Sequence, residues 1–465
     1  MGCAKASPRT SLKLKSKVKK KPGVDSCWHV AALGFLTTFF ITITVSNSSF
    51  FYLGFIQEYG VTREAATWPS SVIWVLSHLS GLPLAALQRR VSLYKIFLLG
   101  GLLSWVGVLA SAFVPTMAWM AVTLGAIHGL GIGIIAIALS ILLSLYFDKY
   151  RCLTQGIKYA GASCAGLIFP KLFAYLQQEY GFRGTLLIYG GITMHVSALC
   201  LLLKEPSWIR LNTSQEATGN TKKELSTVIH TISVDRNKPE KGSTTSDTPE
   251  VKERYPTLKL LLNPMLYVVL TMAVVTDFTG AAYLSTLVDY AVDKGLSIED
   301  AESLVIYGSC SEFVGRLFLP LMADAGCIRR STLVTVNFFV WGCSMMLMPY
   351  ATIHVHIIIV CSFVYLASGC LQPMRSVLIA DYIGVQWLST CYTFSGFILL
   401  PLIFCNPSII GFFRDARGSY DGLYRLYGGI HLLVSVLFLA VVCIERRHSA
   451  IWTLSENTQE KNWWK

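Results

Sequence analysis

Long apolar runs separated by short polar segments recur along almost the whole chain. Each run approaches the roughly 20 residues that a helix needs to cross the hydrocarbon core of a membrane. The run from Leu124 to Tyr146 lacks the alternation of polar and apolar positions that a barrel strand requires. Because backbone polar groups in lipid must be paired within the protein, the pattern predicts membrane-spanning helices. Twelve spans are predicted, at residues 28–51, 66–87, 96–114, 118–146, 155–176, 185–203, 264–288, 303–323, 331–349, 354–379, 389–412 and 426–444.

One long hydrophilic segment interrupts this pattern at residues 204–256. It is rich in Lys, Glu, Ser and Thr and has no apolar period, which is typical of a disordered linker. Six predicted spans lie on each side, and this layout resembles the major facilitator fold. We therefore expect an all-α membrane protein with two six-helix bundles around a central cavity. The predicted parts are a basic tail (1–27), a first bundle (28–203), a mostly disordered linker (204–263), a second bundle (264–444) and a C-terminal tail (445–465).

Composition and charge favour the same class. Hydrophobic residues make up 53% of the chain and charged residues 14%, against about 25% charged in soluble domains. Much of the net charge of +12 lies in the basic tail before the first span, which favours contact with anionic lipid headgroups over nucleic-acid binding. With both termini inside, the predicted cytoplasmic segments hold 29 Lys and Arg and the external loops hold 6. This bias predicts cytoplasmic termini in a multi-pass protein, which we expect in the plasma membrane.

The chain lacks the residue patterns of an enzyme. Its 13 cysteines form no CxxC pair, and no nucleophile–base or metal-ligand spacing is visible. His78, His128 and His195 fall in separate spans and are predicted to be buried and hydrogen-bonded. Lys158 and Lys171 lie towards the two ends of the fifth span and are predicted to be interfacial anchors. We expect no enzymatic activity, no cofactor and no metal.

Besides Lys158 and Lys171, four charged residues fall within predicted spans, where burial in lipid is costly and a cavity or a partner is expected. Glu312 and Arg316 are four positions apart and share one helix face. Arg316 is expected to bind a carboxylate through its planar fork, with Glu312 holding the arginine or carrying a proton. Alternatively, the pair neutralises itself and only holds helices together. Asp277 and Arg375 are expected either to line the transport path or to reach water at the ends of their helices.

The junction between the fourth and fifth spans carries the sequence Tyr-Phe-Asp-Lys-Tyr-Arg-Cys-Leu-Thr-Gln-Gly, followed by Ala160-Gly161. This segment resembles the signature of the monocarboxylate transporter family, and Glu312 and Arg316 fall where that family has its acid–arginine pair. The resemblance implies transport of a small organic anion, proton symport and a single-span accessory glycoprotein as partner. The residues that carry the signature are Tyr146, Phe147, Lys149, Arg151, Gly156 and Gly161.

The first span departs from that family. Members that couple lactate to protons carry a lysine in its outer part, where this chain has Ser49 or Phe50. Asn47 and Phe50 are therefore expected to contact the solute without supplying charge. Lys158 or Arg375 could supply the missing cation from another helix. We expect weak or absent proton coupling and a substrate larger than lactate.

Two other functions remain open at this stage. One is a facilitator of aromatic amino acids or other amphipathic solutes without proton coupling, in which Phe50 packs against a ring. The other is a non-transporting membrane receptor or scaffold, in which Glu312 and Arg316 are buried in a closed helix interface. A polar cavity that Arg316 faces would favour transport.

Overall fold

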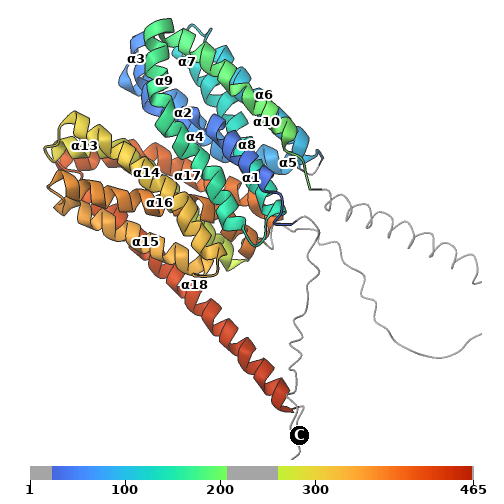
Figure 1. Cartoon of the computed structure of the whole chain (residues 1–465). Coiled ribbons are helices and arrows are strands. Elements are labelled where there is room, and N and C mark those ends of the chain that lie inside the picture. Colours follow the sequence, from blue (N-terminus) through green and yellow to red (C-terminus); the bar gives the residue numbers. More distant parts are fainter. Residues whose placement is uncertain (1–23, 89, 207–259, 463–465) are drawn as a thin grey trace, which may run out of the picture.

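The computed structural model describes residues 24–88, 90–206 and 260–462, and its regular structure is helical in these ranges. Most of the linker and of the basic tail lies outside the described residues. The disorder predicted for the linker and the lipid contact predicted for the tail therefore stay predictions. Figure 1 shows the helices of the first half of the chain gathered in one group and those of the second half in another. The fold is thus an all-helical membrane fold with two bundles, as predicted.

The first half is built from helices that are apolar on most of their surface, as expected for helices that lipid surrounds. Local signals set their ends: Thr62 accepts a hydrogen bond from the Ala65 amide at the start of α4, and Gly60 ends α3 in the left-handed conformation. The elements are α1 (Trp28–Ile41), α2 (Ile43–Ser46), α3 (Ser48–Tyr59), α4 (Arg63–Leu79), α5 (Gly81–Leu87), α6 (Leu93–Ser111), α7 (Met117–Met120), η1 (Ala121–His128), α8 (Gly129–Tyr146), α9 (Arg151–Thr193) and α10 (His195–Leu202).

The second half begins where Asn263 caps α13 by accepting a hydrogen bond from the Met265 amide, with Pro264 at the first helical position. Ser297 caps α14 in the same way through the Asp300 amide. The elements are α13 (Pro264–Asp293), α14 (Ile298–Asp324), α15 (Arg330–Leu347), η2 (Met348–Tyr350), α16 (His354–Tyr382), η3 (Val385–Trp387), α17 (Leu388–Gly411), η4 (Phe412–Ala416) and α18 (Asp421–Asn462).

Ten helical segments in the described ranges are long and apolar enough to cross a membrane. One of them, Arg151–Leu202, turns at Gly181, whose φ of 67° is a conformation that glycine adopts without strain, so it supplies two spans. The predicted first span is interrupted at Thr42 and Asn47 and forms α1, α2 and α3 in succession. Counted in this way, the described helices account for the twelve predicted spans.

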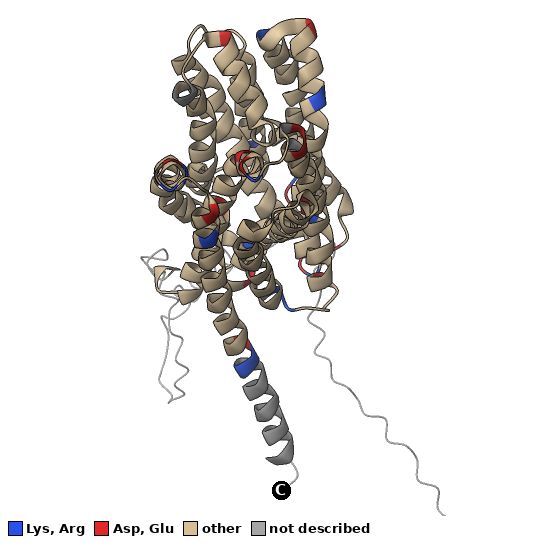
Figure 2. Ribbon diagram, turned by 90° about the vertical axis from the view of Figure 1, so that its left-hand side faces the viewer, with Lys and Arg blue, Asp and Glu red and all other residues tan. Residues whose placement is uncertain are grey.

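The last helix is longer than the predicted span. α18 continues to Asn462, whereas the span was predicted to end at residue 444. The first 18 residues of the predicted tail are therefore helical. Figure 2 shows that the long helices are mostly free of charged residues along their lengths, as expected for spans in lipid.

One end of the bundle, which we call the linker face, carries the described ends of the N-terminal tail and of the linker. There the Asp25 amide donates to the Tyr146 carbonyl, and the Tyr146 hydroxyl donates to the Lys204 carbonyl. The opposite end, the far face, includes the turn at Gly181 and the end of α13. The two halves approach closely at the middle of the bundle, where a Cβ added at Gly156 of α9 would collide with the carbonyl oxygen of Arg316 in α14.

Candidate functional site

Arg316 of α14 is at the centre of a hydrogen-bond cluster that joins the two halves, and only 4% of its surface is exposed. Its Nη2 donates to Glu312 Oε1 at 2.8 Å and to Gln372 Oε1 at 2.9 Å, both in the second half. Its Nη1 donates to the Tyr159 carbonyl at 2.9 Å and to Ser163 Oγ at 2.5 Å, both in α9 of the first half. The predicted pair with Glu312 is present. The guanidinium fork expected to be open is instead held by protein acceptors, and its buried Nε has no hydrogen-bond partner.

Asp277 and Arg375 form a second charged cluster. The two Nη atoms of Arg375 donate to the two carboxylate oxygens of Asp277 at 2.7 and 2.8 Å. His78 of α4, in the other half, contacts the same carboxylate through Nε2 at 3.2 Å and stacks on Trp74. Arg375 is 6% exposed and lies over the ring of Tyr392. Of the two alternatives predicted for these residues, the one in which they reach water at helix ends is wrong, because the two charges pair with each other in the interior.

Lys158 is a buried cation, and the prediction that it is an interfacial anchor is wrong. Its ammonium donates to the Ala136 carbonyl at 2.9 Å and to Ser140 Oγ at 2.6 Å, and it lies 4.4 Å from the centre of the Tyr159 ring. Both acceptors are neutral, and no ion pair of Lys158 occurs among the described residues. Lys171, the other predicted anchor, is exposed.

The two residues expected to contact the solute from the first span have neighbours in the first half of the chain. Phe50 stacks on Phe173 at 4.8 Å and packs near Phe182, so it belongs to an aromatic cluster of that bundle. Asn47 is 4% exposed and donates to the Ile43 carbonyl at 2.8 Å, while its Oδ1 has no partner. Neither residue has a described contact with the Arg316 cluster.

The three histidines differ from one another. His128 is fully buried and hydrogen-bonds Thr44 and the Ser104 carbonyl, as predicted. His195 is exposed, contrary to the prediction. His78 is hydrogen-bonded but not isolated, because it contacts Asp277 across the two halves.

A small cavity of about 60 Å³ adjoins both charged clusters in the second half. Asp277, Glu312 and Gln372 line it together with aromatic side chains, and Trp74 comes from the first half. The sequence did not identify the aromatic residues of this lining as site residues, because each lies in a predicted span, where an aromatic side chain usually packs against lipid or other helices. The lining residues are Trp74, Thr276, Asp277, Gly280, Ala281, Tyr283, Leu284, Glu312, Trp341, Val364, Tyr365, Ser368 and Gln372.

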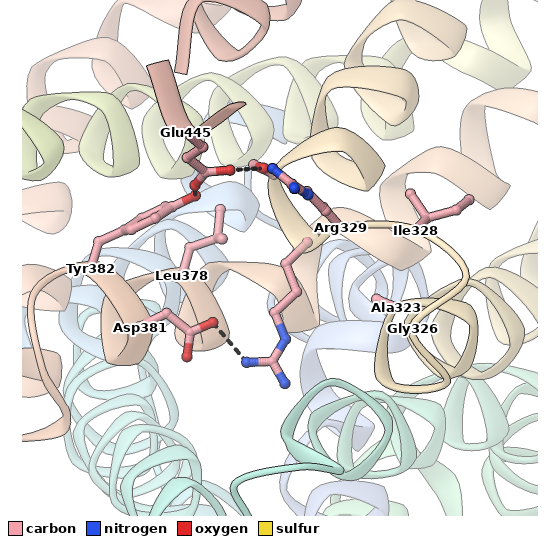
Figure 3. A pocket seen from close by; sticks show the side chains of 10 residues that line it. Ala323, Gly326, Ile328, Arg329, Leu378, Asp381, Tyr382 and Glu445 are labelled. Atoms are coloured by element: carbon pink, nitrogen blue, oxygen red, sulfur yellow. Dashed lines mark hydrogen bonds and ion pairs between the residues drawn. The ribbon is translucent and has the colours of Figure 1, made fainter. Parts of the chain in front are cut away.

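The linker face is closed by a charged network in which the signature segment takes part. Arg151 donates to Asp381 at 2.6 Å, and Arg330 donates to Asp381 at 2.8 Å and to Asp324 at 3.1 Å. Asp324 also accepts from the Leu153 amide at 2.7 Å, so both halves contribute. An adjoining pocket of about 360 Å³ is lined by Asp381 and by Arg330, which pairs with it. Figure 3 shows this pocket with Asp381, Tyr382 and Glu445 in its lining.

Asp25 fixes the rest of the signature segment from the N-terminal side. Its Oδ1 accepts from the backbone amides of Asp148 and Lys149 at 2.9 and 3.0 Å. Phe147 is fully buried and packs against the ring of Trp28. Tyr146, Phe147, Lys149 and Arg151 therefore lie at the linker face, whereas Gly156 and Gly161 lie further along α9 at close helix contacts. None of the six signature residues lines the central cavity.

Comparisons with known proteins agree with this architecture. The sequence profile of the Major Facilitator Superfamily matches residues 34–400. Monocarboxylate transporter 12-B of Danio rerio is 23% identical over 438 residues, which are 92% of this chain and 90% of that protein. Monocarboxylate transporter 2 of Homo sapiens is 22% identical over 436 residues, which are 93% of this chain and 89% of that protein.

Two solved transporters share the fold. FucP in its outward conformation gives a TM-score of 0.60 at 14% identity, covering 88% of this chain and 98% of that chain. The proton:xylose symporter XylE gives a TM-score of 0.63 at 13% identity, covering 89% of this chain and 94% of that chain. At these identities the likeness concerns the fold alone.

Proposed function

The chain belongs to the major facilitator superfamily, whose members are transporters and not enzymes, and we propose that it moves a small organic monoanion across the plasma membrane by alternating access. The observation that carries this proposal is the buried Arg316, which bridges the two halves, hydrogen-bonds two residues that line a small cavity and keeps one N–H without a partner. A buried donor without an acceptor is costly, so a ligand oxygen at this place is favourable.

The charges in the middle of the bundle support an anionic solute. Arg316 and Arg375 are two cations and Glu312 and Asp277 are two carboxylates, so one positive charge is in excess when Lys158 is protonated and His78 is neutral. An isolated charge at membrane depth is costly, and an anion that enters the site removes this excess. A monoanion balances the cluster, whereas a dianion leaves it negative.

In the proposed binding step the carboxylate of the solute replaces Glu312 on Arg316. The Nη2 and Nε atoms lie on the same edge of the guanidinium, and Nε is already unpartnered. A carboxylate can accept from both in the bidentate geometry that arginine favours. Glu312, released from Arg316, then faces the cavity that it lines. Asp277 and Arg375 help to line the path.

The distribution of contacts between the halves supports an arrangement open at the far face. Among the described residues, the hydrogen bonds that cross from one half to the other lie at the linker face and at the centre, as with Arg151 to Asp381. At the far face the ion pairs of the described residues stay within one half, as with Arg183 to Glu58 and Arg414 to Asp293. Rocking of the two bundles would break the hydrogen bonds between the halves and leave the ion pairs within each half intact.

The test of this function is uptake of labelled lactate, pyruvate, creatine and aromatic amino acids by expressing cells, at two external pH values. We expect carboxylates to enter above the level of control cells. The dependence on pH should be weak, because the hydroxyls and amide of the first span supply no charge to exchange for a proton. Acidification of the cell that follows lactate entry and disappears in Glu312→Gln would show that the proposed weak coupling is wrong.

A second candidate is facilitated transport of aromatic solutes. The observation that favours it is the aromatic lining of the cavity, to which Trp74, Trp341 and Tyr365 contribute. Uptake of aromatic amino acids without uptake of lactate or pyruvate would replace the first proposal by this one.

We also propose that the linker face is cytoplasmic, because the segments assigned to it hold 29 of the 39 Lys and Arg. An epitope inserted near Asn220 is expected to stain only permeabilised cells. An epitope in the loop after Gly60, at the far face, is the matched control and should stain intact cells. Staining of intact cells at Asn220 would reverse the orientation.

A further inference from the structure

His78 of α4 has a hydrogen-bond acceptor beside each of its two ring nitrogens. Nδ1 lies 2.8 Å from the Trp74 carbonyl oxygen, and Nε2 lies 3.2 Å from Asp277 Oδ2. A neutral imidazole carries a hydrogen on one nitrogen, whereas an imidazolium donates from both. Because a backbone carbonyl only accepts, Nδ1 carries a hydrogen, and a second one is needed between Nε2 and Oδ2. Without it two lone pairs would face each other where the side chains of His78 and Asp277 are 12% and 9% exposed.

Arg375 determines which atom carries this second hydrogen. Its two Nη atoms donate to the two oxygens of Asp277 at 2.7 and 2.8 Å, which favours the ionised carboxylate. His78 is then the cation of an ion pair that joins α4 in the first half to α13 in the second. Arginine keeps its charge at any physiological pH, whereas histidine gains or loses its charge between about pH 5 and 8. This contact between the halves therefore depends on a bound proton.

The surroundings of His78 leave Asp277 as its charged partner. Arg375 of α16 lies behind that carboxylate, and Tyr392 of α17 lies against the guanidinium of Arg375. Glu312 lines the same cavity as Asp277 but is paired with Arg316. Among the described residues, other ionisable groups on helices packed against α4 are engaged elsewhere, as Glu58 is with Arg183, His128 with Thr44 and Tyr146 with the Lys204 carbonyl.

We propose that His78 is a proton-binding site that holds the linker face closed, because its imidazolium links the two halves and loss of the proton releases the link. The inference rests on the proposed alternating access but not on which solute is carried. Trp74, on which His78 stacks, and Asp277 line the central cavity, which gives water a route to the pair.

The sign of the effect follows from where the proton is bound more tightly. The closed linker face keeps His78 beside Asp277, whereas rocking of the bundles separates them, so the closed arrangement binds the proton more tightly. Acid therefore stabilises the closed linker face, and the link is lost as pH rises. This effect is opposite in sign to proton symport, in which acid on the side of entry speeds uptake.

The charge count at the centre stays the same if His78 carries a proton in place of Lys158. Two arginines and His78 are then three cations beside two carboxylates, with one positive charge in excess as before. Lys158 suits a neutral amine, because its two acceptors, the Ala136 carbonyl and the Ser140 hydroxyl, match the two N–H bonds of an amine. A monoanion therefore still balances the cluster.

The experiment measures how fast a maleimide labels Cys152 in permeabilised cells without solute, at about pH 8 and about pH 6, with serine at the other cysteines. Cys152 is fully buried at the linker face, so the reagent reaches it when this face opens. His78→Gln removes the titrating ring and keeps a neutral N–H donor. Because thiol reactivity itself depends on pH, the labelling rate with His78 is divided by the rate in His78→Gln at the same pH. We expect this ratio to fall about fivefold from pH 8 to pH 6, the factor that separates a hydrogen bond to a charged group from a neutral one.

His195→Gln is the matched control, since His195 is exposed and its ring hydrogen-bonds the Ile192 carbonyl of the same half. Divided by the rate in His78→Gln, its labelling should show the same fall. A ratio that stays constant, or that rises towards pH 6, would overturn the proton-binding site. If His78→Gln is absent from the cell surface, His78→Phe, which keeps a ring to stack on Trp74, is the reference instead. The labelling needs no solute, so absence of carboxylate uptake would refute the proposed function and leave this test unaffected.

Discussion

Replacement of Arg316 by lysine is expected to lower carboxylate uptake by about 100-fold at normal surface expression. Lysine keeps the charge but cannot reach acceptors on both sides, at Ser163 in the first half and at Glu312 and Gln372 in the second. Losing two hydrogen bonds to a charged group costs about 3 kcal/mol, which is the basis of that factor. The measurement is the initial rate of uptake divided by the amount of protein labelled at the cell surface.

Arg417→Lys is the matched control, since Arg417 is exposed near the far face and should tolerate the same exchange. Arg316→Ala is less informative, because it leaves the buried Glu312 without its partner and endangers folding. Unchanged uptake in a well-expressed Arg316→Lys variant would mean that the pair only holds helices together.

Replacement of Gly156 by alanine is expected to keep the linker face from closing. The added methyl group would meet the carbonyl oxygen of Arg316 from the other half, and a backbone atom cannot move aside as a flexible side chain can. Overpacking of this kind costs about 1–3 kcal/mol, so uptake should fall by about tenfold. Cys152, which is fully buried at this face, should become reactive towards a maleimide.

The labelling is measured on permeabilised cells, in a background where cysteines other than Cys152 are serine. Gly191→Ala is the matched control, because Gly191 lies in the same helix, α9, and an added Cβ there has no neighbour within 4 Å. If Gly156→Ala leaves both the labelling of Cys152 and the uptake unchanged, the close approach of the two halves at this glycine is not needed for transport.

Local patterns in the sequence were sufficient for the fold and for one charged pair. Apolar runs of membrane length predict the helices, and the spacing of four places Glu312 and Arg316 on one face of α14. The pair of Asp277 and Arg375 could not be predicted in this way. The two residues are 98 positions apart, and the contact depends on how α13 packs against α16.

Lys158 shows why position within a span was misleading. A lysine near the end of an apolar run usually reaches the interface, but here α8 supplies the Ala136 carbonyl and the Ser140 hydroxyl as acceptors. No feature of the fifth span alone reveals those acceptors. The cavity was missed for a related reason, since Trp341 and Tyr365 are as suitable for packing as for binding.

The four hydrogen bonds of Arg316 have a kinetic consequence for the proposed carrier. Two of them end on the first bundle and two on the second, so the empty protein must give some up before the bundles can rock. A bound carboxylate replaces part of this set and lowers the barrier to reorientation, whereas the empty carrier has no replacement. Return of the empty carrier is then the slow step of net uptake. Solute on the opposite side accelerates the cycle, because the carrier then returns with solute bound.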